Sequence, residues 1–180
     1  QTADKGYVIA GGLRLFWLFK VDSQGSVLWS NIYPLNEDST SAQLFSMIQT
    51  SDGGFALAGS INTYDGGDDF WLIKTNHVGV AQWNHTYNSG TYTNQVGEVS
   101  PRNDEAKCVI QTRDGGYALV GSASLYSSST SSVTYSSWVV KTDANGGQTW
   151  NKGYDLLNLQ GYKTVIIQTS DNGYAIAGTQ

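Results

Sequence analysis

Short apolar runs separated by polar, glycine-containing turns fill this 180-residue sequence. The clearest pattern is Gln-Thr-x-Asp-x-Gly followed by Tyr or Phe, then by three small or aliphatic residues and a further glycine. No stretch of any length has the spacing of an amphipathic helix, so the pattern predicts β-strands joined by tight turns. The pattern occurs at Gln1–Tyr7, Gln49–Phe55, Gln111–Tyr117 and Gln168–Tyr174.

A second half of the pattern follows the first three copies. It contains a tryptophan, a lysine three residues later, a turn, a second tryptophan and a closing tyrosine. The two tryptophans of a copy are always 12 residues apart, and these pairs account for all 6 tryptophans of the chain. The chain is therefore built from an internal repeat. The repeated positions are Trp17, Lys20, Trp29 and Tyr33, then Trp71, Lys74, Trp83 and Tyr87, then Trp138, Lys141, Trp150 and Tyr154.

Each complete copy of the repeat predicts four strands. The first ends at the Gln-Thr pair, the second is the Tyr-Ala-Leu-Val-Gly run, and the third and fourth each carry one tryptophan. Asp-Gly or Asn-Gly between the first two strands supplies residues with positive φ. Asp or Asn opens, and glycine closes, the turn between the last two strands. The predicted fold class is all-β, a β-propeller of four-stranded antiparallel blades.

The repeat also predicts the domain organisation. Residues 1–42 form a first blade that lacks its first strand, 43–105 and 106–160 form two further blades, and 161–180 form the first two strands of a fourth. A closed propeller has about 4 to 8 whole blades, and the two ends of this array do not complement each other. We therefore expect a partial propeller from a larger one, with assembly of several copies into a ring as the alternative.

The connections between strands vary in length on one side only. The first and third turns of each copy keep their length, whereas the separation from Gly to Trp across the second connection grows from 6 to 12 to 17 positions. The connection from one copy to the next varies as well. In an up-and-down blade these two variable connections lie on the same face, which is where repeat proteins often bind partners.

The motifs resemble the propeller repeats of archaeal and bacterial cell-surface proteins over essentially the whole chain. The resemblance implies a propeller of roughly 7 or 8 blades, an extracellular setting and a multidomain parent protein. More distantly, Asp-x-x-Gly-x-x-x-Trp is similar to the tryptophan-docking repeat of quinoprotein propellers. Those enzymes use a quinone pocket with metal-liganding acids and usually a vicinal cysteine pair, and the single cysteine here, Cys108, does not support that catalysis.

Composition and charge narrow the choice of partners. The net charge of −5 and a pI near 4.7 argue against nucleic acid, whose phosphates require a basic face. No window approaches the roughly 18 consecutive apolar residues of a membrane-spanning helix. This piece of sequence begins without the charged start and apolar stretch of a signal peptide. A single cysteine also excludes a disulfide framework.

Candidate sites for metal binding or catalysis are weak. Asp-Gly-Gly-Asp-Asp could bind Ca²⁺ through carboxylate oxygens, yet the spacing matches no known calcium loop and is also ordinary turn chemistry. Paired acids in the insertion at residues 97–105 are read more simply as a solvated loop than as acid–base catalysts. His77 and His85 have no obvious carboxylate or nucleophile partner. No catalytic residue and no cofactor are assigned, and the residues considered for calcium are Asp65, Asp68 and Asp69.

Aromatic side chains in the variable connections are the better ligand-binding candidates. The repeated tryptophans are explained by packing between blades, whereas tyrosines that do not repeat are free to stack on sugars. Asn84, in Asn84-His85-Thr86, is the only N-glycosylation sequon and is a candidate modification site. The candidate ligand-binding residues are Tyr64, Tyr92, Tyr126 and Tyr135.

The sequence therefore favours a non-catalytic, extracellular or cell-surface propeller module with a structural or protein-binding role. Its expected partners are other protein chains or the remaining blades of the same protein. A carbohydrate-binding lectin is the first alternative. The second is the scaffold of an enzyme whose active site lies in blades outside this sequence.

Overall fold

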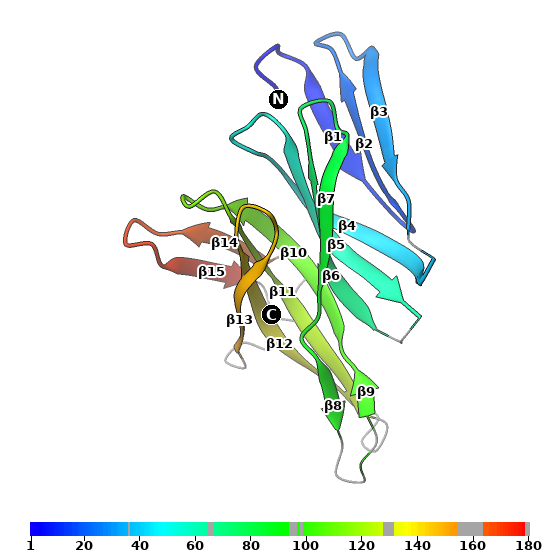
Figure 1. The fold of residues 1–180 in the computed structure, drawn as a ribbon, viewed down its shortest axis with the longest axis vertical. Helices are drawn as coiled ribbons and strands as arrows, with labels where there is room; N and C mark the ends of the chain where they lie inside the picture. Colours follow the sequence, from blue (N-terminus) through cyan, green and yellow to red (C-terminus); the bar gives the residue numbers. More distant parts are fainter. Residues whose placement is uncertain are drawn as a thin grey trace.

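The computed structural model is all-β, with antiparallel sheets and no helix among the residues it describes. The described residues are 1–35, 37–64, 67–93, 97, 99–127, 132–154 and 164–178. Apart from a small two-stranded hairpin, the strands form four sheets, which follow one another along the chain from blue to red in Figure 1. In each of them the strands lie in chain order, and every pair of neighbours is antiparallel.

The first two sheets contain three and four strands. The pairing of the first two strands of sheet 2 has two register shifts, both in the first strand, and one of them falls between Leu44 and Ser46. Sheet 1 consists of β1 (Tyr7–Gly11), β2 (Phe16–Val21) and β3 (Val27–Tyr33). Sheet 2 consists of β4 (Ser39–Gln49), β5 (Phe55–Thr63), β6 (Asp68–Thr75) and β7 (Ala81–Tyr87).

The last two sheets contain four and two strands. Sheets 2 and 3 confirm the predicted four-stranded antiparallel unit. Sheet 3 consists of β10 (Asn103–Gln111), β11 (Tyr117–Ser127), β12 (Ser132–Thr142) and β13 (Gln148–Tyr154). Sheet 4 consists of β14 (Thr164–Gln168) and β15 (Tyr174–Gly178).

The insertion between sheets 2 and 3 is more ordered than the solvated loop expected for residues 97–105. It contains a separate hairpin of β8 (Thr91–Thr93) and β9 (Val99–Pro101). Strand β10 begins at Asn103, because its pairing with β11 continues as far as Ser124. Asp104 and Glu105 therefore belong to a strand, which the polar sequence alone did not reveal.

The tight turn that precedes the strand beginning with Tyr or Phe in each sheet has one residue with positive φ, as the sequence predicts. That residue is glycine in sheets 2 and 3, where Gly53 and Gly115 both have a φ of 82°. Lys5 (φ 65°) and Asn172 (φ 67°) hold the same place in sheets 1 and 4. Lysine pays a steric cost in this region, so the turn geometry is imposed by the repeat and not by glycine alone.

The core lies between successive sheets, which pack face to face. Alternate residues of a strand point to opposite faces, so each central strand contributes to two interfaces. On β5, Phe55 and Leu57 pack toward sheet 1, whereas Ala56 and Ala58 pack toward sheet 3. The same alternation on β11 sends Leu119 toward sheet 2 and the residues beside it toward sheet 4.

Two tyrosine hydroxyls join one sheet to the next. Tyr33, the last residue of sheet 1, donates to the carbonyl of Gly79 in sheet 2 at 2.7 Å. Tyr87, the last residue of sheet 2, donates to the carbonyl of Gly146 in sheet 3, also at 2.7 Å. Both tyrosines are buried, and burial raises the pKa of each phenol, so each stays a donor at neutral pH.

Aromatic rings add to each of these interfaces. Trp29 lies 6.2 Å from Phe55, Trp83 lies 5.7 Å from Tyr117, and Trp150 lies 5.8 Å from Tyr174, measured between ring centroids. Each pair joins the second tryptophan of one copy to the first aromatic residue of the next copy. The tryptophans therefore pack between sheets, as their fixed spacing indicates.

The Tyr87 hydroxyl provides a direct test of this interface. Replacing Tyr87 with Phe keeps the ring but leaves the buried Gly146 carbonyl without its donor, so we expect the free energy of unfolding to fall by about 1–2 kcal/mol. Urea denaturation measures the difference. Tyr64→Phe is the matched control, because Tyr64 is 72% exposed and its loss should change stability little. Equal effects of the two variants would contradict the assigned role of the hydroxyl.

Candidate functional site

The stacked sheets present two different ends to solvent. The turn end contains the tight turns at residues 50–54, 76–80, 112–116 and 143–147, and the loop end contains the connections that follow β5, β7 and β11. In Figure 1 the hairpin of β8 and β9 lies at the bottom of the view, next to the far ends of β11 and β12. The length variation seen in the sequence thus falls on the loop end.

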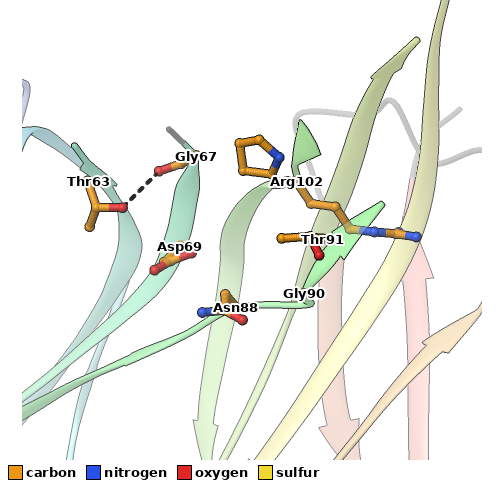
Figure 2. Close-up of a pocket in the computed structure, with 8 residues that line it drawn as sticks. Thr63, Gly67, Asp69, Asn88, Gly90, Thr91 and Arg102 are labelled. Atoms are coloured by element: carbon orange, nitrogen blue, oxygen red, sulfur yellow. Dashed lines mark hydrogen bonds between the residues drawn. The ribbon is translucent and has the colours of Figure 1, made fainter. Parts of the chain in front are cut away.

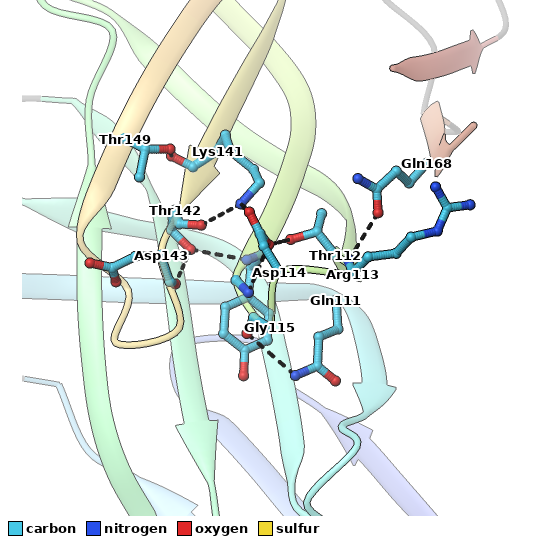
Figure 3. A network of polar contacts seen from close by, with 12 residues as sticks. Gln111, Thr112, Arg113, Asp114, Gly115, Lys141, Thr142, Asp143, Thr149 and Gln168 are labelled. Atoms are coloured by element: carbon cyan, nitrogen blue, oxygen red, sulfur yellow. Dashed lines mark hydrogen bonds and ion pairs between the residues drawn. The ribbon is translucent and has the colours of Figure 1, made fainter. Parts of the chain in front are cut away.

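The turn end is held by a network that repeats from sheet to sheet. In sheet 3, Thr112 donates its hydroxyl to Asp114 at 2.5 Å, and Lys141 donates to the same carboxylate at 2.8 Å (Figure 3). The Gly116 amide also donates to Asp114, at 3.1 Å. Sheet 2 repeats the arrangement with Asp52 and its partner lysine, which lie 2.7 Å apart.

Electrostatics at the turn end favour charged, paired side chains. The Lys141 side chain is 6% exposed, and it also donates to the Thr142 carbonyl at 2.7 Å. The hydrogen bond from Lys141, followed by that from Thr112, lowers the pKa of Asp114 to about 2. The recurring lysines are therefore partners of the turn aspartates within their own sheet. These groups are occupied by structural contacts, which argues against a catalytic use.

Glutamine side chains connect neighbouring turns at this end. The Gln111 side-chain oxygen accepts from the Ser51 amide of the preceding sheet at 2.8 Å. Gln168 accepts from the Arg113 amide at 2.9 Å in the same way, as Figure 3 shows. The sequence shows a glutamine at the start of every copy of the repeat. It does not show that the side chain of this glutamine contacts the preceding copy.

A small cavity opens at the loop end between sheets 2 and 3. Its volume is about 100 Å³, enough for a few water molecules. Figure 2 shows that its walls come from the ends of β5 and β6, from the segment after β7 and from the residues around β9. The cavity is lined by Thr63, Gly67, Asp69, Asn88, Gly90, Thr91, Pro101 and Arg102.

A buried carboxylate supports the loop end. Asp104 is fully buried and accepts two hydrogen bonds from Ser89, from the amide at 2.6 Å and from the hydroxyl at 2.8 Å. Burial raises the pKa of Asp104 to about 6, and the bonds from Ser89 and the charge of Arg102 offset only part of that effect. Asp104 therefore fixes the chain as it leaves β7.

The polar sequence around Asp104 predicts a solvated loop, so the buried position of this acid was not expected. The strand register contains the signal. Asp104 lies opposite Ala123, as Ala42 lies opposite Ile61 in sheet 2, and Ala42 is a core residue. Alignment of the two first strands on their bulges would have placed the carboxylate at a core position.

The calcium candidates are only partly described. Asp65 lies outside the described residues. Asp68 and Asp69 are consecutive on β6, so their side chains project to opposite faces of the sheet. Asp68 accepts from the Asn62 amide group at 2.9 Å, and its own backbone amide donates to Asn103 at 3.1 Å. Among the described residues, no three His, Cys, Asp or Glu side chains are grouped to hold a metal ion.

The four candidate tyrosines come from three places on the loop end. Tyr64 follows β5 and is 72% exposed, whereas Tyr135 on β12 is half-buried. Tyr92 belongs to β8 and Tyr126 to β11, and the side chains of both lie outside the described residues. Of the two candidates whose side chains are described, Tyr64 is therefore the one with a solvent-exposed ring.

The sequon asparagine also has a structural contact. Asn84 is exposed on β7, and its side-chain oxygen accepts from the Trp71 indole at 3.2 Å. Asn151 accepts from Trp138 in the same way in sheet 3, at 3.3 Å. The contact uses the amide oxygen, so the nitrogen that carries an N-linked glycan remains available for modification. Nearby, His85 lies 3.0 Å from the Asn145 carbonyl of the next sheet.

Comparison with known proteins does not identify the chain. No family model matches it, and no curated protein matches it. It is similar to a solved structure of a protein of unknown function from Bacteroides caccae, with 9% sequence identity and a TM-score of 0.30, over 81% of this chain and 79% of that one. A similarity at this level supports no statement about function. In the part of the chain that the structure describes, no helix is long and apolar enough to cross a membrane.

The buried Asp104 predicts an unusual pH dependence. Between about pH 4 and pH 6 the unfolded chain ionises this group while the folded chain keeps it protonated, so the folded state loses stability as pH rises. The loss amounts to about 3 kcal/mol at most, because one pKa unit corresponds to about 1.4 kcal/mol. Asp104→Asn cannot titrate, so its stability relative to the original protein should increase across this range.

Urea denaturation at pH 4 and pH 7 measures the effect as a difference between the two proteins, which removes the contribution of the other acids. Asp38→Asn is the matched control, because Asp38 is an exposed acid. Its denaturation curves should follow those of the original protein. Parallel pH profiles for Asp104→Asn and the original protein would show that Asp104 does not titrate abnormally.

Proposed function

We propose that this chain is a series of consecutive β-propeller blades in a non-catalytic module of an extracellular or cell-surface protein, with a structural or protein-binding role. Its partners are other protein chains or further blades of the same protein. The face-to-face packing of the four sheets in chain order carries the proposal. Radial repetition of four-stranded sheets is how propellers protect their strand edges.

The placement of the first strands supports a propeller over a flat stack. Strand β10 contacts β4 of the preceding sheet and β14 of the following one. In a propeller, the first strands of neighbouring blades likewise approach one another around the central axis. The Tyr33 and Tyr87 hydroxyls then join the last strands to the next sheet.

The difference between the repeated contacts of the turn end and the variable connections of the loop end supports a binding role for the loop end. The repeated residues are engaged at the turn end or between sheets, in contacts that recur from copy to copy. The connections at the loop end differ in length and sequence, and they carry the exposed Tyr64. A partner that discriminates between related proteins must recognise residues that differ between them, and such residues lie at the loop end.

Cell-surface location is tested by antibody access. Antibodies raised against this chain should label intact cells that produce the protein as strongly as they label permeabilised cells. An antibody against an abundant cytoplasmic protein serves as the control and should label only permeabilised cells. Labelling of this chain that requires permeabilisation would contradict the proposed location.

The lectin alternative rests on the exposed ring of Tyr64 at the loop end. If the chain is a lectin, a glycan array should show binding to a defined set of sugars, and Tyr64→Ala should weaken that binding about fivefold or more, since stacking on an aromatic ring contributes about 1 kcal/mol. Tyr7→Ala is the control, because Tyr7 is exposed on a different surface. Binding that survives Tyr64→Ala would remove the reason for this alternative.

A further inference from the structure

Matched positions of the repeat differ in exposure between sheet 1 and the sheets that follow it. The first aromatic residue of the second strand is 48% exposed at Tyr7, but 3% exposed at Phe55 and 1% exposed at Tyr117. Two residues further on, Ile9 is 41% exposed, whereas its counterparts Leu57 and Leu119 are fully buried. In sheets 2 and 3 these side chains face the preceding sheet.

The closing glycine of the third turn shows the same difference. A Cβ added at Gly79 or Gly146 would lie within 3 Å of a tryptophan ring of the preceding sheet. A Cβ added at Gly25 would meet no atom within 4 Å. All three glycines have positive φ, at 76°, 84° and 89°, so the backbone of the Gly25 turn already has the conformation that receives a neighbour elsewhere.

The buried lysine follows the pattern as well. The Lys74 and Lys141 side chains are each 6% exposed, whereas Lys20 is 17% exposed although it makes the same ion pair with its turn aspartate. The polar network of sheet 1 is thus complete within the sheet. What sheet 1 lacks is an apolar cover over the face formed by Tyr7, Ile9 and Gly25, here called the outer face of sheet 1.

We infer that the outer face of sheet 1 binds an antiparallel sheet of the same repeat, whose last strand carries a tryptophan and, four residues later, a tyrosine. The tryptophan packs on Tyr7, as Trp150 packs on Tyr174. The tyrosine hydroxyl donates to the Gly25 carbonyl, as Tyr87 donates to Gly146. This inference rests on the proposed arrangement of consecutive blades and specifies the partner of one surface.

Continuity with the three interfaces already present selects this occupant. Each of them pairs a second tryptophan with the first aromatic residue of the next sheet, and the outer face of sheet 1 offers the receiving half of that contact. An unrelated helix or loop would fill the apolar area. It would have no reason to match both the open Gly25 turn and the ring of Tyr7.

A fusion protein can supply this partner from the chain's own sequence, in the register of the repeat. Gln1 opens the first copy of the repeat as Gln168 opens the last, so residues 103–167 can be duplicated directly before Gln1. The duplicate supplies a complete four-stranded sheet with Trp150 and Tyr154, followed by the missing first strand of sheet 1. The full original chain follows unchanged.

Protection of Ile9 is the measurement. In a Cys108→Ser background, which matches Ser46 at the corresponding strand position, Ile9→Cys reports access of a maleimide to the outer face. We expect the labelling rate to fall at least tenfold in the fusion relative to the unfused chain. Val133→Cys in the original sheet 3 is the matched control, since Val133 is also 41% exposed, and its rate should not change.

A second fusion tests the hydroxyl itself. Tyr154→Phe in the duplicated segment keeps the ring and removes only the donor to Gly25, so labelling at position 9 should rise several-fold relative to the first fusion. Unchanged labelling in the first fusion, with far-UV circular dichroism showing that the added segment forms β-structure, would overturn the inference. Surface labelling of intact cells would still decide the proposed function separately.

A second copy of the chain is the competing occupant. Protection of position 9 in the unfused protein that increases with protein concentration, together with a dimer in sedimentation velocity, would assign the surface to self-association and would also overturn the inference. Monomeric behaviour with full labelling, followed by protection in the fusion, is the result that supports a repeat sheet.

Discussion

The close approach of one sheet to the next is the constraint on which the rest of the structure depends. A tryptophan ring of one sheet lies against the closing glycine of a turn in the next, and a buried tyrosine hydroxyl donates to the carbonyl of that same glycine. A side chain at Gly79 or Gly146 would collide with the ring, and the positive φ of both residues excludes most other amino acids. The fixed length of this turn in every copy follows from that geometry.

The same constraint explains how far the sequence predicts the fold. The 12-residue spacing of the tryptophans and the glycine of each turn report contacts that every interface must make, so strand order and sheet size could be read directly. Asp104 and the β8–β9 hairpin could not, because each occurs once. A buried acid in a polar segment becomes visible only when strand register shows that it occupies the place of the core residue Ala42.

The packing of successive sheets also separates the residues that are needed for packing from those that are available for binding. A residue that must meet a neighbouring sheet is constrained by that sheet, and the turn aspartates are further tied to buried lysines such as Lys141. The connections at the loop end bear neither restriction, so they tolerate insertions and changes of charge. The candidate tyrosines belong to these connections, and this placement follows from chain topology. Which of their rings reaches solvent does not follow from sequence, because Tyr64 is exposed and Tyr135 is half-buried.

An interface built by repetition has a consequence for the ends of the array. Sheets 2 and 3 are each covered by a neighbouring sheet on both faces. Sheets 1 and 4 each have one face with exposed apolar side chains, such as Ile9 and Ile167. In repeat proteins stability grows through the interfaces between neighbours, so an uncovered terminal face represents stabilisation not yet gained. Such a face favours further sheets of matching chemistry over unrelated surfaces, because only a matching sheet satisfies the glycine carbonyl and the apolar positions together. The interaction that orders the four sheets therefore also determines what can be added to them.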